Sequence, residues 1–374
     1  MPNSEVVETC SEIDSVNRWG HDKYNVSVQE YVNFRKNGFL VVQNLLSDAD
    51  VAELQSHTED LMLGQLPEQS SVSNVGHDGG SNGTNVQALE APPPHLNAEE
   101  RAQYFLRIHM LHRKLALHEK TMLHPRVLDV LEVLQGPDVL ALQTMLFIKA
   151  PGKPGQGWHQ DSYYIPTQPD TLIGAWIALD EVDEENGAMW MALGSQNEPV
   201  YPPKADYGFG NVEISDIARV AGISDTDDEK NDLSKIADRY PQVLVCASPG
   251  DVVFFGGHVL HRSKRNFSQT RLRRAFVSHY CNARSYTFWQ GEADPNNRYG
   301  NGGVDPLNGS ANALHILARG DTHMPFAQPR FGNECAATLS AESRERIGQA
   351  RNRQIADMDS GMMGMGPAEV PEHS

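Results

Sequence analysis

The amino-terminal third of the chain repeats its apolar residues with the period of amphipathic helices. Ser27 and Glu30 have the spacing of a capping box, and Gly38 stands where such a helix can end. Ser47, followed by Asp50, gives a second start signal of the same kind. We therefore expect a short apolar strand at residues 39–42 and helices at residues 28–37, 51–63, 99–119 and 125–134.

The period changes from about residue 139 onward. Short runs of β-branched and aromatic residues follow one another, separated by turns such as Pro151-Gly152 and Pro249-Gly250. Strands without helices between them favour a double-sheet barrel over a doubly wound parallel sheet. The expected strands are residues 139–148, 172–179, 188–193, 243–247, 251–255 and 271–281.

Composition marks the ends of the chain and two internal segments. Residues 67–97 are rich in Ser, Gly and Pro, and residues 197–240 contain a run of acidic residues. We expect both to be loop insertions, either disordered or acting as lids over a site. The predicted division is an extension at 1–25, a single domain at 26–336 and a partly disordered tail at 337–374.

The balance of charges excludes some classes of partner. The 49 acidic and 31 basic side chains give a formal net charge of −18, which repels a phosphate backbone, so no nucleic acid is expected. A small-molecule substrate remains compatible with this charge, even an anionic one, because a local basic pocket can oppose the global field. No apolar run is long enough to cross a membrane and the first residues lack a secretory signal, so we expect a cytoplasmic protein. The four cysteines lack paired CxxC spacing, which predicts free thiols.

His159-Gln160-Asp161 is the first part of a candidate metal site. Residues two apart in an extended strand point to the same side, so His159 and Asp161 can present an imidazole and a carboxylate to one ion while Gln160 turns away. Taken alone, the motif is more often a hydrogen-bonded pair at the end of a strand than a metal site.

A second segment, one hundred residues later (261 − 161 = 100), supplies the missing donor. His258 and His261 are three apart, so an extended strand points them to opposite faces and only one of them is expected to be a ligand. We favour His261, because Ser263 lies on the same side and its hydroxyl can join a carboxylate site. With His159 and Asp161, it completes the two-histidine, one-carboxylate triad that holds non-haem iron(II) and leaves coordination positions open.

Three arginines follow on the next predicted strand. Alternation places Arg271 and Arg273 on one face and Arg274 on the other. An arginine directed into a barrel needs an anionic partner, because an unpaired buried charge is very costly. We assign Arg273 to a small dicarboxylate, whose geometry its guanidinium fork fits. We interpret Arg271 and Arg274 as a solvated basic edge.

These residues, together with further blocks, resemble the phytanoyl-CoA dioxygenase family. The resemblance spans roughly residues 26–285, and the blocks occur in the family's order. They are Phe34 to Val42, Leu45 to Ser47, Gln143, Trp158 to Asp161, Trp176 to Asp180, Asn186 to Ala188, Gly194 to Gln196, Pro249 to Phe255, His261 to Ser263, Asn266 and Arg273 to Ala275.

The resemblance implies a double-stranded β-helix, a cupin-like jelly roll that is mainly β with flanking helices. It also implies that His159, Asp161 and His261 bind Fe(II). An intact Asp161 disfavours a halogenase, because halogenases of this kind replace the carboxylate to make room for a halide.

For the co-substrate, the resemblance implies that Ser263 and Arg273 hold the distal carboxylate of 2-oxoglutarate and that Gln143 and Trp176 line its pocket. The interval of twelve residues from His261 to Arg273 is one longer than expected, which leaves room for a bulge or for the use of a neighbouring arginine. Gln196 stands where the family usually has a histidine.

The function we predict is that of an iron(II)- and 2-oxoglutarate-dependent dioxygenase. It uses dioxygen to oxidise an aliphatic carbon of a small organic molecule, most simply by hydroxylation, and releases succinate and CO2. One alternative is a cupin-like isomerase or hydrolase that uses its metal only as a Lewis acid. Another is a binding protein that keeps only the barrel. A dicarboxylate pocket argues against the first and an intact triad against the second. The sequence does not identify the substrate.

Overall fold

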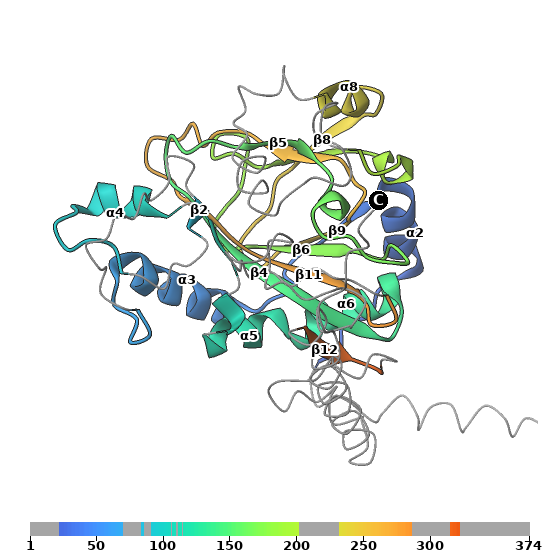
Figure 1. The fold of residues 1–374 in the computed structure, drawn as a ribbon, viewed down its shortest axis with the longest axis horizontal. Helices are drawn as coiled ribbons and strands as arrows, with labels where there is room; N and C mark the ends of the chain where they lie inside the picture. The colour runs from blue at the N-terminus through green and yellow to red at the C-terminus, as the bar shows by residue number, and fades with distance from the viewer. Residues whose placement is uncertain are drawn as a thin grey trace, which may run out of the picture.

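Two β-sheets packed face to face form the body of the molecule (Figure 1). The structure is a computed structural model, and it describes residues 22–69, 84–85, 91–105, 107–109, 111–113, 115–201, 232–285 and 315–321. Helices cover the outer face of the larger sheet (Figure 1). The predicted fold, a mainly β jelly roll with flanking helices, is confirmed.

The larger sheet has eight strands in the order β1-β9-β6-β11-β4-β3-β2, with β12 paired to β4. Its two longest strands, β4 (Val139–Lys149) and β11 (Arg273–Asn282), are antiparallel neighbours. All of its pairs are antiparallel except β2 with β3. The other strands are β1 (Phe39–Val42), β2 (Thr84–Asn85), β3 (Arg107–His109), β6 (Ile173–Ala178), β9 (Val252–Gly256) and β12 (Ile316–Arg319).

The smaller sheet has four short strands in the order β5-β10-β7-β8, all antiparallel. Their bounds are β5 (Gln156–His159), β7 (Met189–Ala192), β8 (Gln242–Val245) and β10 (His261–Ser263). Every strand predicted between residues 139 and 281 is therefore present, with its ends shifted by one or two residues.

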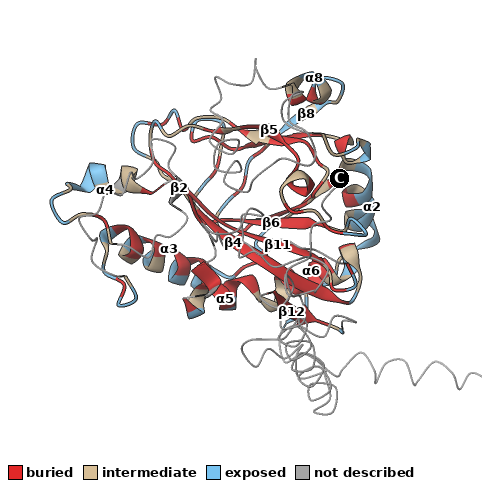
Figure 2. Cartoon of the chain, viewed as in Figure 1, coloured by how far each residue is buried: buried red, intermediate tan, exposed pale blue. Residues whose placement is uncertain are grey.

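Alternation along the central strands divides their side chains between two cores. Ile177 of β6 joins the core beneath the helices, whereas Trp176 enters the core between the sheets. In β11, Phe276 joins the first core and Val277 the second. Both faces of these strands are buried, as Figure 2 shows. From Arg273 to His279, the odd-numbered side chains of β11 therefore face the space between the sheets.

The first two helices begin at the predicted signals, and the first ends at its predicted glycine. Ser27 and Glu30 form both hydrogen bonds of a capping box, and Gly38 ends the helix in the left-handed conformation, at a φ of 86° that favours glycine. Ser47 accepts from the backbone N–H of Asp50 at the next helix. The helices are α2 (Val28–Asn37), α3 (Asp48–Leu63), α4 (Ala98–Tyr104), α5 (Ala116–Met122), α6 (Pro125–Gln135) and α8 (Leu233–Ala237), with 3-10 turns η1 (Leu111–Arg113), η2 (Asp161–Tyr163) and η3 (Ser195–Asn197).

The single helix predicted at residues 99–119 is wrong. The chain leaves α4 at Phe105, which is extended, and forms β3, η1 and α5 instead. Arg107 pairs with Phe147 of β4, so the intervening residues complete the hydrogen bonds of a sheet edge. Pairing with a long neighbouring strand outweighs the local helical period in this segment.

Several predictions fall largely outside the described residues. They are the extension at 1–25, the tail at 337–374 and most of the two loop insertions at 67–97 and 197–240. In the described parts of those insertions lie β2 and α8, which the sequence did not predict. Among the described helices, none combines the length and the apolar character that crossing a membrane needs. The two described cysteines, Cys246 and Cys281, are free thiols, as expected.

Candidate active site

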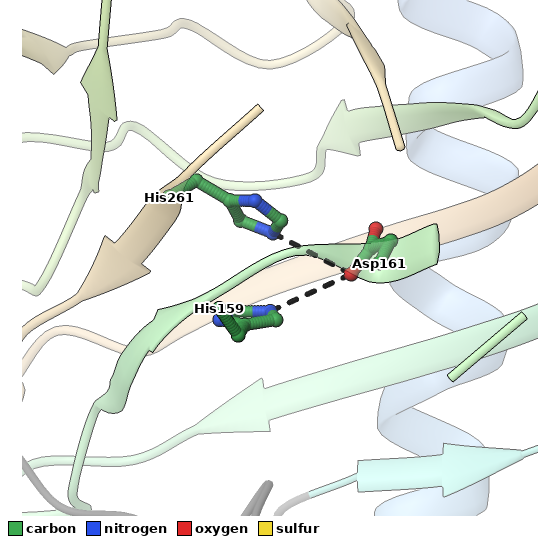
Figure 3. A group of neighbouring side chains, drawn as sticks. All are labelled: His159, Asp161 and His261. Carbon is green, nitrogen blue, oxygen red and sulfur yellow. Dashed lines mark ion pairs between the residues drawn. The ribbon is translucent and has the colours of Figure 1, made fainter. Parts of the chain in front are cut away.

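Two imidazoles face each other across neighbouring strands of the smaller sheet. The register of β5 and β10 pairs His159 directly with His261, and their ring centroids are 4.1 Å apart. The Nδ1 of His159 lies 2.8 Å from the carbonyl oxygen of Gly157, and that of His261 lies 3.0 Å from the carbonyl oxygen of Val259. A ring whose Nδ1–H donates to a carbonyl keeps its Nε2 lone pair free. Both Nε2 atoms face Asp161 (Figure 3), and that of His159 also accepts a hydrogen bond from the side-chain amide of Gln156 at 3.0 Å.

Asp161 approaches these imidazoles from a turn rather than from a strand. β5 ends at His159, and Asp161 begins η2, so the strand alternation that we expected for this pair does not hold through Asp161. Its Oδ1 nevertheless lies 3.5 Å from Nε2 of His159 and 3.7 Å from Nε2 of His261 (Figure 3). Gln160 turns away, as expected, and its amide donates to the carbonyl oxygens of Pro199 and His258.

The three side chains fit a metal ion. They are buried, and one donor atom from each lies within 4.8 Å of the others. Burial lowers the pKa of His159 to about 3, so its imidazole is neutral and its Nε2 carries no proton. A metal ion would take the place of the Gln156 amide that this nitrogen contacts. Burial alone would raise the pKa of Asp161, but the neighbouring His261 and His279 hold it well below its usual range. Two neutral nitrogens and one carboxylate on one side of an ion are the donor set of a non-haem iron(II) site.

His279 is a functional candidate that the sequence did not reveal. Its Nε2 lies 2.8 Å from Oδ2 of Asp161, the carboxylate oxygen that does not face the two imidazoles. It is buried in the middle of β11, and its Nδ1 lies 3.0 Å from Nε2 of Gln143. No motif marks His279, but it is six residues beyond Arg273, and this even spacing in a strand places both side chains on the inner face.

A cavity beside the triad runs between the two sheets. Its apolar lining comes mainly from the larger sheet. The lining residues are Met145, Phe147, Gln156, His159, Asp161, Trp176, Met189, Phe255, His261, Arg262, Ser263, Arg273, Val277 and His279. Trp176, Ser263 and Arg273 therefore line the same cavity as the three triad residues, and their contacts with 2-oxoglutarate stay a prediction.

Arg273 brings a buried positive charge to this cavity. Its side chain is only 3% exposed, and its guanidinium lies 5.8 Å from the ring centroid of Trp176 and 6.0 Å from that of Phe147. Burial lowers its pKa to about 10, so it remains charged at neutral pH. Within the described part of the chain its Nε has no hydrogen-bond partner. A buried cation in this state is costly unless an anion joins it, and a carboxylate of 2-oxoglutarate fits that requirement.

Ser263 lies at the same end of the cavity with its hydroxyl oxygen already engaged. The ammonium of the buried Lys149 donates to Oγ of Ser263 at 3.0 Å, and the backbone N–H of Gln156 donates to it at 3.3 Å. Since Lys149 is the strand partner of Arg273, two cations flank this hydroxyl. With both contacts donating to its oxygen, the hydroxyl proton of Ser263 is free to be donated to an anion.

The three arginines that the sequence placed together have different partners. Arg274 points to the outer face and is buried, where its guanidinium binds Asp180 at 2.7 Å and Glu59 at 3.1 Å. Its interpretation as part of a solvated edge is therefore wrong, because a strand covered on both faces leaves no solvated side. Only Arg273 of the three lines the cavity.

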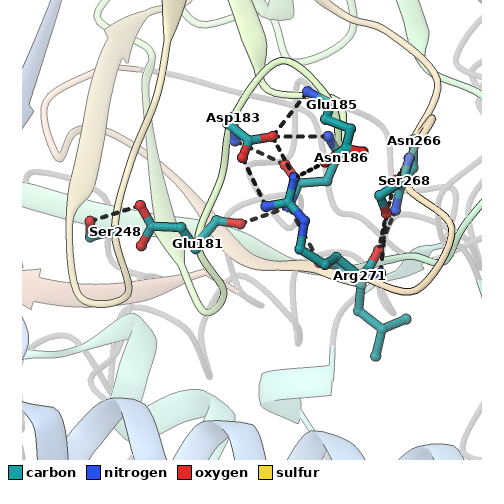
Figure 4. A network of polar contacts seen from close by, with 9 residues as sticks. Glu181, Asp183, Glu185, Asn186, Ser248, Asn266, Ser268 and Arg271 are labelled. Carbon is teal, nitrogen blue, oxygen red and sulfur yellow. Dashed lines mark hydrogen bonds and ion pairs between the residues drawn. The ribbon is translucent and has the colours of Figure 1, made fainter.

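Arg271 precedes β11 and lies in a surface network of polar contacts (Figure 4). Its guanidinium forms two hydrogen bonds with Asp183, at 2.8 and 2.9 Å, and a third with Glu185. Asn266 and Ser268 bind the backbone carbonyl of Arg271 from the same side (Figure 4). These contacts fix the turn before β11, so the longer interval between His261 and Arg273 is absorbed in the loop and does not shift the arginine that enters the cavity.

Two further residues singled out from the sequence, Gln143 and His258, do not line the cavity. Gln143 is buried behind His279 and does not line the cavity, so its expected contact with 2-oxoglutarate stays a prediction. His258 is not among the three clustered donors; its Nε2 pairs with Asp170 at 2.5 Å, and its other ring nitrogen contacts the carbonyl oxygen of Glu198. Of the two histidines weighed as ligands, only His261 lies with His159 and Asp161.

Comparison with known proteins places this site in a family. The family model described as "Phytanoyl-CoA dioxygenase (PhyH)" matches residues 34–275. "Phytanoyl-CoA dioxygenase, peroxisomal" of Bos taurus is 28% identical over 263 residues, covering 69% of this chain and 69% of the relative. The Homo sapiens protein of that name is 25% identical over 290 residues, covering 75% and 76%.

A solved structure with a similar fold is the epimerase SnoN in complex with Fe3+, alpha ketoglutarate and nogalamycin RO. It aligns with a TM-score of 0.50 and 18% identity, over 75% of this chain and 92% of that one. At this identity the likeness supports the fold alone.

Proposed function

The chain belongs to the phytanoyl-CoA dioxygenase family, and on that premise we propose that it oxidises an aliphatic carbon of a small organic molecule. Family membership makes it a 2-oxoglutarate-dependent non-haem iron dioxygenase, with Fe(II), 2-oxoglutarate and dioxygen as its cofactor and co-substrates. Hydroxylation is the simplest outcome and the one we propose. The products that accompany it are succinate and CO2.

His159, Asp161 and His261 are the residues that we assign to iron. The bound iron, with 2-oxoglutarate and dioxygen, supplies the oxidant that removes hydrogen from the substrate carbon. The imidazoles contribute two neutral donors, and Asp161 contributes the one negative charge. A donor set of two imidazoles and one carboxylate would hold the ion while leaving positions for the co-substrate and dioxygen.

Arg273 is the residue that we assign to the distal carboxylate of 2-oxoglutarate, with the hydroxyl of Ser263 as a second donor. Trp176 and Phe147 flank the guanidinium and exclude water from it. A carboxylate held there is fixed by charge-assisted hydrogen bonds in a low-dielectric setting, which orients the keto acid toward the triad. Lys149 supports this end by holding Ser263 in place.

The observation that carries the proposal is that one cavity is lined by the triad and by a buried arginine whose Nε has no hydrogen-bond partner among the described residues. A metal-dependent isomerase or hydrolase has no use for a dicarboxylate pocket beside its ion. The relatives support an oxygenase acting on a small organic molecule, and their name, phytanoyl-CoA dioxygenase, points to fatty acyl thioesters as the first compounds to test.

Succinate formation tests this proposal. The purified protein is supplied with Fe(II), ascorbate, 2-oxoglutarate and dioxygen, with and without a panel of acyl thioesters and free carboxylic acids. We expect succinate to appear only with iron present and to increase with a substrate, together with an oxidised product that is 16 mass units heavier for hydroxylation. Conversion of a substrate without 2-oxoglutarate would instead support the isomerase or hydrolase.

A further inference from the structure

We propose that His279 is a positioning residue that holds the carboxylate of Asp161 in a one-oxygen binding mode, and that Gln143 sets the tautomer of His279 for this task. The inference rests on the proposed function, because it concerns the carboxylate assigned to iron. It assigns a role to two buried side chains that the binding of iron and 2-oxoglutarate does not otherwise use.

A continuous chain of hydrogen bonds joins the three residues. Nε2 of Gln143 lies 3.0 Å from Nδ1 of His279, and Nε2 of His279 lies 2.8 Å from Oδ2 of Asp161. Gln143 and His279 are each 3% exposed, so water does not compete for these contacts. In such a setting each hydrogen bond is electrostatically stronger than it is in water.

The fold brings these three residues together from the larger sheet and from the turn that follows β5. β4 and β11 pair Gln143 directly with His279, and both side chains point to the inner face. The register of this pair shifts immediately after His279, where Tyr280 faces Ala141. Irregularities of this kind re-aim side chains beside active sites. Asp161 comes from η2, beyond the smaller sheet, so the contact ties the metal-binding turn to the centre of the larger sheet.

The amide of Gln143 determines which nitrogen of His279 carries the proton. An N–H of Gln143 donates to Nδ1, which must then be unprotonated, so a neutral ring carries its proton on Nε2 and donates it to Asp161. His159 and His261 have the opposite tautomer, because their Nδ1–H groups donate to backbone carbonyls. The backbone therefore prepares two rings to bind a metal, and Gln143 prepares the third to bind a carboxylate.

Occupying Oδ2 has a consequence for the metal. A carboxylate with both oxygens free can bind an ion through both of them, and the second oxygen then takes a coordination position that the keto acid or dioxygen needs. Oδ1, the oxygen near the two imidazoles, is the one that His279 leaves available. Residues that hydrogen-bond to the ligands of a metal site orient those ligands, and their loss typically costs about 10- to 100-fold in metal affinity or activity.

Metal affinity and the ferrous spectrum test the proposal. Co(II) binding to the full-length apoprotein is measured by calorimetry, and the visible charge-transfer band of the Fe(II)–2-oxoglutarate complex is recorded without oxygen. We expect His279→Leu to weaken Co(II) binding by about 10- to 100-fold and to shift or weaken the band. His279→Gln keeps an N–H donor and should restore much of the affinity. Gln143→Leu should weaken binding by a smaller factor in the same direction.

His118→Leu is the matched control. His118 is also fully buried, but it packs against Phe276 on the opposite face of β11, away from the triad. Thermal unfolding of each apoprotein separates loss of fold from loss of binding, and Gln143→Leu supplies the test where His279→Leu does not fold. Wild-type affinity in folded His279→Leu, or equal losses in His279→Leu and His118→Leu, would overturn this inference while leaving the oxygenase intact. A wild-type protein that binds no metal and forms no succinate would instead refute the proposed function.

Discussion

The smaller and the larger sheet contribute to the cavity in different ways. The smaller sheet has strands of three or four residues, and it supplies His159 and His261 from directly paired positions. The larger sheet has strands of up to eleven residues, and it supplies Trp176, Arg273 and His279 from its inner face. The short strands thus carry the two histidines that we assign to iron. The long strands carry the residues that we assign to orienting 2-oxoglutarate and the carboxylate of Asp161.

The largest expected effect comes from removing a ligand on the smaller-sheet side. Asp161→Ala takes away the only negative charge among the three donors, so we expect succinate formation to fall to background and Co(II) binding to be lost in calorimetry. His258→Ala is the control, because His258 lies near this region but outside the triad. Retained succinate formation in Asp161→Ala would contradict the assignment of Asp161 to iron.

The second-largest effect is expected from Arg273, on the inner face of the larger sheet. Arg273→Leu removes the one cation that lines the cavity from β11, and losing one partner of a buried charge pair costs about 2–5 kcal/mol. That energy corresponds to roughly a 30-fold or greater increase in the 2-oxoglutarate concentration needed for half-maximal rate. Steady-state kinetics with varied 2-oxoglutarate measure it. We expect Arg273→Leu to leave the Co(II) affinity almost unchanged. A loss of metal binding as large as that of Asp161→Ala would contradict the assignment of Arg273 to 2-oxoglutarate and not to the ion.

Arg274, the next residue, gives a matched contrast because it faces the other core. Arg274→Leu leaves Asp180 without its buried partner, and breaking a pair of this kind costs about 3–5 kcal/mol of unfolding free energy. We expect a large drop in stability in chemical denaturation and little change in the 2-oxoglutarate requirement of the folded protein. If Arg274→Leu raised that requirement as much as Arg273→Leu, the assignment of the two arginines to different faces would fail.

The smallest effect concerns the link between His258 and Asp170, which joins the turn before His261 to the segment after η2. The hydrogen bond to Asp170 raises the pKa of His258 above 6.5. Burial would raise the pKa of Asp170, but His258 lowers it below 3.8. A raised histidine pKa contributes stability below 6.5 that is lost as the pH rises through the folded value. A lowered carboxyl pKa contributes stability above 3.8 that is lost as the pH falls through the folded value.

The pair should therefore stabilise the fold most between about pH 4 and pH 6.5. Because each side chain is about 30% exposed, we expect His258→Gln to cost less than ~1 kcal/mol there. Unfolding of the two proteins at several pH values measures the difference, which should shrink at pH 8. A difference that does not vary with pH would show that the charge of the pair contributes nothing.

Local patterns predicted much of this molecule, because the signals concerned are local. Helix caps such as Ser27 and Gly38, and the alternation of the central strands, depend on neighbours a few residues away. The triad was found because His159 and Asp161 form a short motif and His261 follows a recognisable turn and strand. These features need no knowledge of which strands pair.

The residues that escaped prediction depend on pairing. His279 has no neighbouring motif, and it contacts Asp161 only because β11 crosses the sheet opposite η2 at one register. The burial of Arg274 likewise depends on α3, which supplies Glu59 from 215 positions away in the chain. The helix predicted at 99–119 is interrupted for the same reason, because residues 107–109 pair as β3 with the distant strand β4. Each miss is a case in which contacts between distant segments override a local preference.

A crystal structure of the protein grown without oxygen, with Fe(II) and 2-oxoglutarate, tests the central claim most directly. We expect iron, identified by its anomalous scattering, to be bound to Nε2 of His159, Nε2 of His261 and one oxygen of Asp161. We also expect the keto acid on the ion with its distal carboxylate against the guanidinium of Arg273. Iron bound elsewhere, or a co-substrate carboxylate directed away from Arg273, would contradict the claim.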